Sequence, residues 1–245
     1  MGVQAADFVQ NGNYLTVQLK QHQNYGPSQI RLQVVTDRII RVQATAEQGF
    51  RNKQSLIIVP QNSKAKYKVE EQGDDLIITT AAMRAVLNEA TGQITFYDLK
   101  DQVLLKEVAQ GGKTFKPFTV SDREIGVDIA KVPEAQKHGW SWRALFDSPD
   151  NEAFYGLGQH QSEELNMKGK NEDLFQYNTK VSVPFVISNK NYGILWDSYS
   201  YSRWGNPDDY LQLNRAFKLY DKDGKEGQLT GTYVDKNGQK IVCGE

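Results

Sequence analysis

The amino-acid sequence predicts an all-β protein built as an antiparallel β-sandwich. Apolar and polar residues alternate with a period of two through most of the first 110 residues. Short strand patterns recur roughly every 8–12 residues with turn residues between them, which is typical of sandwiches and barrels. A helical stripe of 12 residues is absent between the strands, so a βαβ arrangement is not supported.

The alternation is clearest near the start of the chain. Segment 14–19 alternates, and Ile30, Leu32 and Val34 share one strand face. After a turn at 36–37, segment 40–44 repeats the pattern. These segments predict a hairpin of half-buried strands.

Further strands are predicted up to residue 108. They are 55–59 (ended by Pro60), 67–70, 76–79, 83–88, 94–97 and 103–108. Segment 83–88 also contains helix formers, but the turn residues at 91–93 follow at once and favour a strand.

The second half is less regular. We expect residues 109–139 to form a long surface excursion, followed by strands at 140–146, 181–188 and 192–197. Pro184 places its position at an edge or a bulge, because proline cannot donate to a strand ladder. A last sandwich strand is expected at 211–220.

A charged, glycine-rich stretch at 221–227 predicts a domain boundary. We therefore expect a β-sandwich domain over residues 1–224 and the start of a second β-module over 225–245. The N-terminus carries neither a basic region nor an apolar signal core. We expect a fragment of a longer protein. That protein is either cytoplasmic or exported with its signal peptide removed, and the periplasm or another location outside the cytoplasm is favoured.

Composition disfavours several function classes. The net charge of −1 disfavours nucleic acid and anionic membranes as partners, and no apolar run reaches the roughly 18 residues of a membrane span. One cysteine, Cys243, forms no disulfide framework. The three histidines, His22, His138 and His160, show no metal-ligand spacing, so neither a metal nor another cofactor is expected.

The most distinctive stretch is 154–161, which holds Gly156, Gly158 and His160 between strand patterns. The glycines permit either a bulge close to another backbone or a functional loop. His160 is likewise open to two interpretations, a hydrogen-bonded structural residue or a sugar contact.

The better binding candidate is the run Gln176, Tyr177, Asn178 and Thr179. Amide, phenol and hydroxyl groups read sugar hydroxyls, and an aromatic face stacks on a pyranose ring. The alternative is that Asn178 and Thr179 only form a turn before the next strand. Of the aromatics from Tyr192 to Tyr210, most are expected in the core and one or two beside a groove.

Catalytic residues cannot be chosen from the carboxylates. Glycoside hydrolysis needs a pair about 5–5.5 Å apart for retention of configuration. The adjacent acidic pairs are interpreted as solvated loop charge: Glu163 with Glu164, Glu172 with Asp173, and Asp208 with Asp209.

Several motifs together resemble family 31 glycoside hydrolases over about residues 10 to 220. The matching segments are 30–34 with 39–42, the run 154–160, Asn178-Thr179, 184–186 and 192–197. The run 154–160 is similar to the family's (F/Y)-Y-G-L-G-E signature, although Gln159 stands where the family has Glu. The similarity is greatest to bacterial α-xylosidases and α-glucosidases.

This resemblance implies a galactose-mutarotase-like sandwich that precedes a (β/α)8 barrel carrying both catalytic aspartates. Nothing in this chain resembles that barrel, so none of its residues is expected to be catalytic. The implied partners are the barrel of the same polypeptide and an oligosaccharide with α-linked xylose or glucose. Residues 176–179 correspond to a sandwich loop that reaches the barrel pocket.

The tail from residue 227 to 233 resembles the first strand of a protective-antigen-like lectin module that some family members carry as an insertion. The sandwich would then have an unpaired edge. Three functions stay open: a non-catalytic glycosidase domain, a free-standing carbohydrate-binding module, and a mutarotase-type epimerase that needs a histidine and a carboxylate in one cleft.

Overall fold

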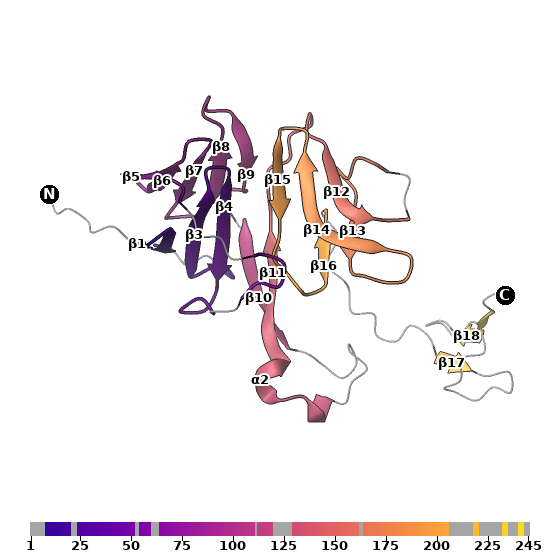
Figure 1. Cartoon of the computed structure of the whole chain (residues 1–245). Helices are drawn as coiled ribbons and strands as arrows, with labels where there is room; N and C mark the ends of the chain where they lie inside the picture. Colours follow the sequence, from indigo (N-terminus) through magenta and orange to yellow (C-terminus); the bar gives the residue numbers. More distant parts are fainter. Residues whose placement is uncertain are drawn as a thin grey trace. The chain divides into compact units, whose positions relative to one another are not determined.

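The computed structural model describes residues 8–20, 24–51, 54–59, 64–110, 112–119, 129–161, 164–205, 218–220, 232–234 and 240–242. Two compact units divide the chain, Met1–Gly205 and Asn206–Glu245. The regular secondary structure of the described residues is almost entirely antiparallel strand (Figure 1), which confirms the predicted all-β class.

Two sheets form the first half of the larger unit. The first contains, in spatial order, β1 (Phe8–Asn11), β2 (Tyr14–Gln18), β3 (Gln29–Thr36) and β4 (Ile39–Thr45). The second contains β5 (Lys68–Gln72), β6 (Asp75–Thr79), β7 (Arg84–Asn88), β8 (Ile94–Tyr97) and β9 (Val103–Lys106).

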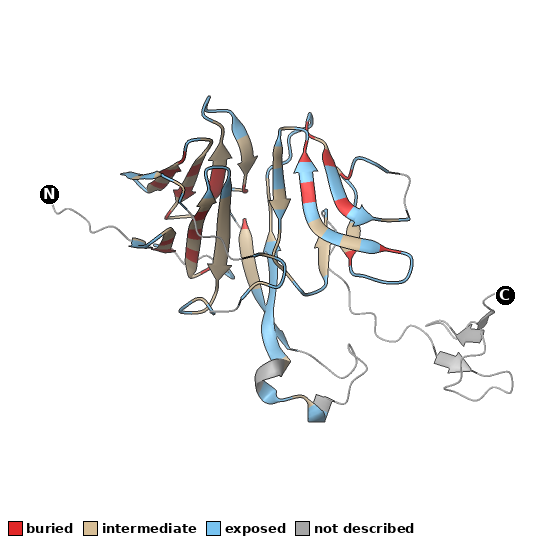
Figure 2. Cartoon of the chain, viewed as in Figure 1, coloured by how far each residue is buried: buried red, intermediate tan, exposed pale blue. Residues whose placement is uncertain are grey.

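One hydrophobic core joins these two sheets. Leu15, Ile30 and Leu32 contribute from the first sheet, while Leu76 and Leu87 contribute from the second, all with no exposed surface. The alternation that predicted these strands is the alternation between core and outer face seen in Figure 2. The sandwich prediction is confirmed here, including the assignment of 84–88 as a strand.

Segment 55–59 corrects the sequence prediction, because it forms a bend and not a strand. The hydroxyl of Ser55 accepts hydrogen bonds from the backbone N–H of Ile57 (3.2 Å) and of Ile58 (2.9 Å). A serine that captures neighbouring N–H groups withdraws them from a strand ladder.

The predicted excursion at 109–139 is also corrected in part. β10 (Lys113–Thr119) pairs along its length with β11 (His138–Ala144) in a two-stranded ribbon (Figure 1). The 3-10 turn η1 (Ile129–Lys131) and the short helix α2 (Glu134–Lys137) precede β11. Pro117 fits within β10 because each strand of a two-stranded ribbon is an edge.

The second half of the larger unit has its own sheet and core. β12 (Phe154–Gln159), β14 (Val181–Ser188) and β15 (Tyr192–Leu195) lie in that order, and β13 (Glu172–Leu174) pairs with β16 (Ser202–Trp204). Their core consists of Phe154, Leu157, Met167, Leu174 and Val186, with Tyr192, Ile194, Trp196 and Trp204 packed against it. The Trp196 and Trp204 rings stack with centroids 5.9 Å apart, as expected for core aromatics.

The smaller unit contains β17 (Lys218–Tyr220), β18 (Thr232–Val234) and β19 (Lys240–Val242) in one antiparallel sheet. We expected 211–220 to be the last sandwich strand. Of it, the structure describes β17, whose neighbour is the later strand β18. The predicted boundary between 224 and 225 lies outside the described residues. Within the described part, no helix has the length and apolarity to cross a membrane.

Candidate functional site

The segment 176–179 forms an exposed turn just before β14. Tyr177 and Lys180 form an isolated antiparallel bridge, and the Lys180 N–H donates to the Tyr177 carbonyl at 3.1 Å. Asn178 and Thr179 occupy the centre of this turn. The structure therefore brings the four candidate sugar-contacting residues together at one surface.

A buried ion network supports the turn from below. The Lys180 side chain is 7% exposed, and its ammonium donates to Glu172 Oε1 and to the Asp173 carbonyl. Glu172 lies on β13, so its interpretation as solvated loop charge is wrong. A charge pair removed from water needs extra hydrogen bonds, and the Lys180 ammonium has one to the Asp173 carbonyl.

His160 belongs to the same network. Its Nδ1 lies 3.0 Å from Glu172 Oε1, and its Nε2 lies 2.8 Å from the Leu157 carbonyl oxygen. Only 6% of its side chain is exposed. Nε2 thus donates to the Leu157 carbonyl, while Nδ1 lies against the Glu172 carboxylate without a hydrogen bond, so His160 packs between the end of β12 and the base of the turn.

The backbone of β12 requires glycine at its bulge. The register of β12 against β14 shifts between Gly156 and Gly158, and the intervening Leu157 is buried at a φ of 67°. At Gly158, where φ is +101°, a Cβ would overlap the Val181 carbonyl. The bulge interpretation of this motif is confirmed, and the bulge places His160 next to Glu172.

The polar groups of the turn differ in their freedom. Gln176 Oε1 accepts the Ser182 N–H at 3.1 Å, so its carbonyl is already used. Within the described residues, the side chains of Asn178 and Thr179 make no hydrogen bond. They remain available as donors and acceptors for an external ligand.

Exposed aromatic rings surround the turn. The Phe175 ring centroid lies 5.2 Å from that of Tyr177 and 5.9 Å from that of Tyr201. The Tyr201 hydroxyl donates to Asp173 Oδ1 at 2.6 Å, which fixes that ring. Phe175 is not among the residues predicted from the sequence. Its adjacency to the polar run was the available signal.

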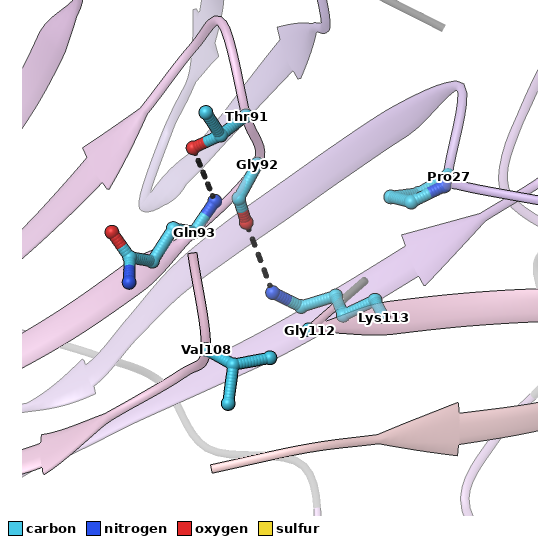
Figure 3. A pocket seen from close by; sticks show the side chains of 7 residues that line it. All are labelled: Pro27, Thr91, Gly92, Gln93, Val108, Gly112 and Lys113. Carbon is cyan, nitrogen blue, oxygen red and sulfur yellow. Dashed lines mark hydrogen bonds between the residues drawn. The ribbon is translucent and has the colours of Figure 1, made fainter. Parts of the chain in front are cut away.

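A small cavity lies at the start of β10. The cavity in Figure 3 has a volume of about 10 Å³, close to one water. It is lined by Pro27, Thr91, Gly92, Gln93, Val108, Gly112 and Lys113. Lys113 donates to the Gly92 carbonyl at 3.2 Å and to Glu107 Oε2.

Burial governs the titration of that Lys113–Glu107 pair. Desolvation raises the pKa of the Glu107 carboxyl and lowers the pKa of the Lys113 ammonium, while the attraction between them partly offsets both shifts. The pair anchors the start of β10 to β8 through the Ile94 N–H, which donates to Glu107 Oε2 at 2.9 Å. Its place in the fold is structural.

The remaining candidate groups are the possible metal ligands and the surface residue His138. In the described part of the chain, no three His, Cys, Asp or Glu residues are placed to hold a metal ion. His138 Nε2 lies 2.9 Å from Glu134 Oε1, and both side chains are more than half exposed. Lys137 and His138 lower the pKa of the Glu134 carboxyl through hydrogen bonds.

Comparison with known proteins identifies the fold family. Residues 29–204 match the model of the glycosyl hydrolase 31 N-terminal galactose mutarotase-like domain. An α-xylosidase of Saccharolobus solfataricus is 25% identical over 185 residues, which are 71% of this chain and 23% of that protein.

Solved structures agree with this match. The family 31 α-xylosidase of Xanthomonas citri is 37% identical with a TM-score of 0.69, over 98% of this chain and 23% of that one. A family 31 α-xylosidase from a soil metagenome, solved with xylose, is 26% identical with a TM-score of 0.64, over 81% and 29% of the two chains.

The chain thus spans about a quarter of the length of these relatives. The family model covers more than half of the chain, from β3 to β16, and includes the β12 bulge and the turn at 176–179. The resemblance seen in the sequence motifs is confirmed. The chain belongs to the family of glycosyl hydrolase 31 N-terminal galactose mutarotase-like domains.

Proposed function

We propose that this chain is the non-catalytic N-terminal domain of an α-glycosidase, with α-xylosidase or α-glucosidase specificity. In this role the domain supports the catalytic barrel of the same polypeptide and contributes the turn at 176–179 to the substrate pocket. The substrate is an oligosaccharide with α-linked xylose or glucose. The family membership and the α-xylosidase relatives support this assignment.

The observation that carries the pocket role is the construction of the turn. The buried Lys180–Glu172 pair fixes its base, while Asn178 and Thr179 are exposed at its tip. A rigid base with free polar groups at the tip is what a substrate contact requires, because little entropy is then lost on binding. The exposed ring of Tyr177 adds an apolar face for a pyranose.

The carboxylates favour a non-catalytic role. Glu107 is engaged by Lys113, Glu152 by Ser188 and Tyr192, and Glu172 by Lys180. Hydrogen bonds of this kind hold each acid as an anchor inside the fold.

A free-standing carbohydrate-binding module is the second candidate, since the rings of Phe175, Tyr177 and Tyr201 are each more than 40% exposed. An epimerase of mutarotase type is less supported. The His160–Glu172 pair has the required residue types, but it is buried beneath the turn. The His138–Glu134 pair lies on open surface.

We also propose that residues 225–245 begin an inserted lectin-like module and that the enzyme acts outside the cytoplasm. The first proposal rests on the sequence resemblance, and the second is an expectation from the N-terminal sequence.

An activity assay of the separate chain tests whether this domain is non-catalytic. The 245-residue chain should release no sugar from aryl α-xylosides or aryl α-glucosides, whereas the full polypeptide should release it. Turnover that copurifies with the chain through successive columns would overturn the proposal. Micromolar binding of xylose or glucose oligosaccharides by the chain alone would favour the binding-module alternative.

A further inference from the structure

The outer face of the β12–β14–β15 sheet is apolar and uncovered. Val181, Val183, Phe185 and Ile187 alternate along β14, so their side chains lie on one face. Each is between 37% and 49% exposed. The opposite face of the same strands carries Val186 and belongs to the core.

The neighbouring strands extend this face. Tyr155 on β12 lies directly opposite Ile187, and Leu195 on β15 lies directly opposite Phe185. Residues paired in this way share a face of the sheet, and both are exposed, Tyr155 at 39% and Leu195 at 46%. A Cβ at Gly193 would lie 3.0 Å from the Phe185 ring, so the ring occupies the space beside this glycine.

Charge is absent from these strands. β12 reads FYGLGQ, β14 reads VSVPFVIS and β15 reads YGIL, with no Asp, Glu, Lys or Arg. Proteins usually place charged residues on exposed sheet surfaces, and a contiguous apolar patch marks an interaction site. Loss of charge with enrichment of aromatics is the composition of an interface core.

We infer that this outer sheet face, formed by Tyr155, Val181, Val183, Phe185, Ile187 and Leu195, is a permanent interface with the remainder of the same family 31 polypeptide. Permanent interfaces are more apolar than transient ones, and this face is apolar except for Gln159, which lies opposite Val181 at its end. The chain spans only 23% of the Xanthomonas citri structure while 98% of it is matched there, so a large remainder of such a polypeptide is available as occupant.

The location supports the same occupant. Val181, at one end of the face, directly follows the turn at 176–180. A body packed on this face therefore lies beside the turn that we assign to the substrate pocket. The inference rests on the proposed function, because it identifies the surface through which the domain joins its partner.

Side-chain footprinting of the full polypeptide with hydroxyl radicals tests the inference. After correction for the intrinsic reactivity of each residue type, labelling of Tyr155 and Phe185 should be about fivefold lower than that of the control residues, because an interface core excludes water. The controls are Tyr25 and Leu99, which are 48% and 58% exposed and lie outside the face. Labelling of Tyr155 and Phe185 at the level of the controls would overturn the inference.

Light scattering on the same sample distinguishes an intramolecular interface from one formed with a second copy. Protection in a monomer supports the intramolecular interface. Protection that appears only in an oligomer, and is lost on dilution, assigns the face to a second copy and overturns the inference. Neither outcome depends on sugar binding. Failure of the interface inference can therefore be told apart from failure of the proposed pocket role, which is measured by kinetics.

Two variants of the full polypeptide provide a second measurement. Ile187→Glu places a charge in the face and should raise Phe185 labelling towards that of Tyr25. Val9→Glu, at a 69% exposed position on β1, should leave it unchanged. If Ile187→Glu does not fold, the comparison of Phe185 with Tyr25 in the parent polypeptide decides the question.

Discussion

The Nδ1 atom of His160 lies 3.0 Å from Oε1 of Glu172, an oxygen that also binds the Lys180 ammonium. This arrangement joins the end of β12, the strand β13 and the turn that precedes β14. It explains how a short exposed turn is held in one conformation. The proposed pocket role of Asn178 depends on that rigidity.

Removing the cation should destabilise the domain. Lys180→Met leaves the Glu172 carboxylate beside the imidazole alone, and loss of one partner of a buried pair costs about 3 kcal/mol. The control Lys170→Met breaks the half-exposed Lys170–Glu164 pair and should cost less than about 1 kcal/mol. Urea unfolding of the chain measures both, and equal costs would show that the Lys180 network is not a structural anchor.

The β12 bulge should reject any side chain at Gly158. Gly158→Ala forces a Cβ into the Val181 carbonyl, and we expect a cost of about 3 kcal/mol from overpacking and strain. Gly169 is a matched control, because its φ of +70° is also left-handed but its Cβ would meet nothing within 4 Å. Gly169→Ala should cost about 1 kcal/mol, as for any left-handed alanine. A similar thermal midpoint for the two variants would refute the close approach of β12 to β14.

Breaking the Lys113–Glu107 pair should make the stability of the domain depend more strongly on pH. In Lys113→Met, the buried Glu107 has lost its cation, so its raised pKa is raised further. A carboxyl whose folded pKa exceeds its unfolded value contributes stability at low pH and loses it as the pH rises. The variant should therefore lose stability relative to the parent as the pH rises above the Glu107 pKa of the parent, which already exceeds the ordinary carboxyl value of 4.5.

Thermal unfolding at pH 5 and pH 8 measures this difference. The control Lys106→Met removes the half-exposed partner of Asp147, 3.6 Å away, and should show little change between the two pH values. A Lys113→Met deficit that is equal at both pH values would contradict the assignment of Glu107 as the group responsible.

Much of the fold is predictable from alternation alone. Strands such as β3 and β7 bury every second side chain against one core, so their sequence records which face is inside. The strand β10 was not predicted, because its last four residues are exposed and Pro117 suggests a break. Segment 55–59 has the residue pattern of a strand, but Ser55 binds the N–H groups of Ile57 and Ile58 and makes it a bend.

The candidate site was only half predictable. The polar run 176–179 could be found because its residue types suit sugar hydroxyls. The network beneath it could not, since pairing of β13 with β16 is what brings Glu172 into the fold. A neighbouring pair of acids in sequence is usually solvated, and only tertiary contacts reveal that Glu172 binds Lys180.

The most direct test measures kinetics of the full polypeptide on the proposed α-linked substrate. Asn178→Ala should lower kcat/KM about tenfold, equivalent to about 1.4 kcal/mol for one lost hydrogen bond to the sugar. Asn151→Ala, at another exposed turn, should leave kcat/KM unchanged. A kcat/KM for Asn178→Ala equal to that of the parent and of Asn151→Ala would contradict the assignment of this turn to the substrate pocket.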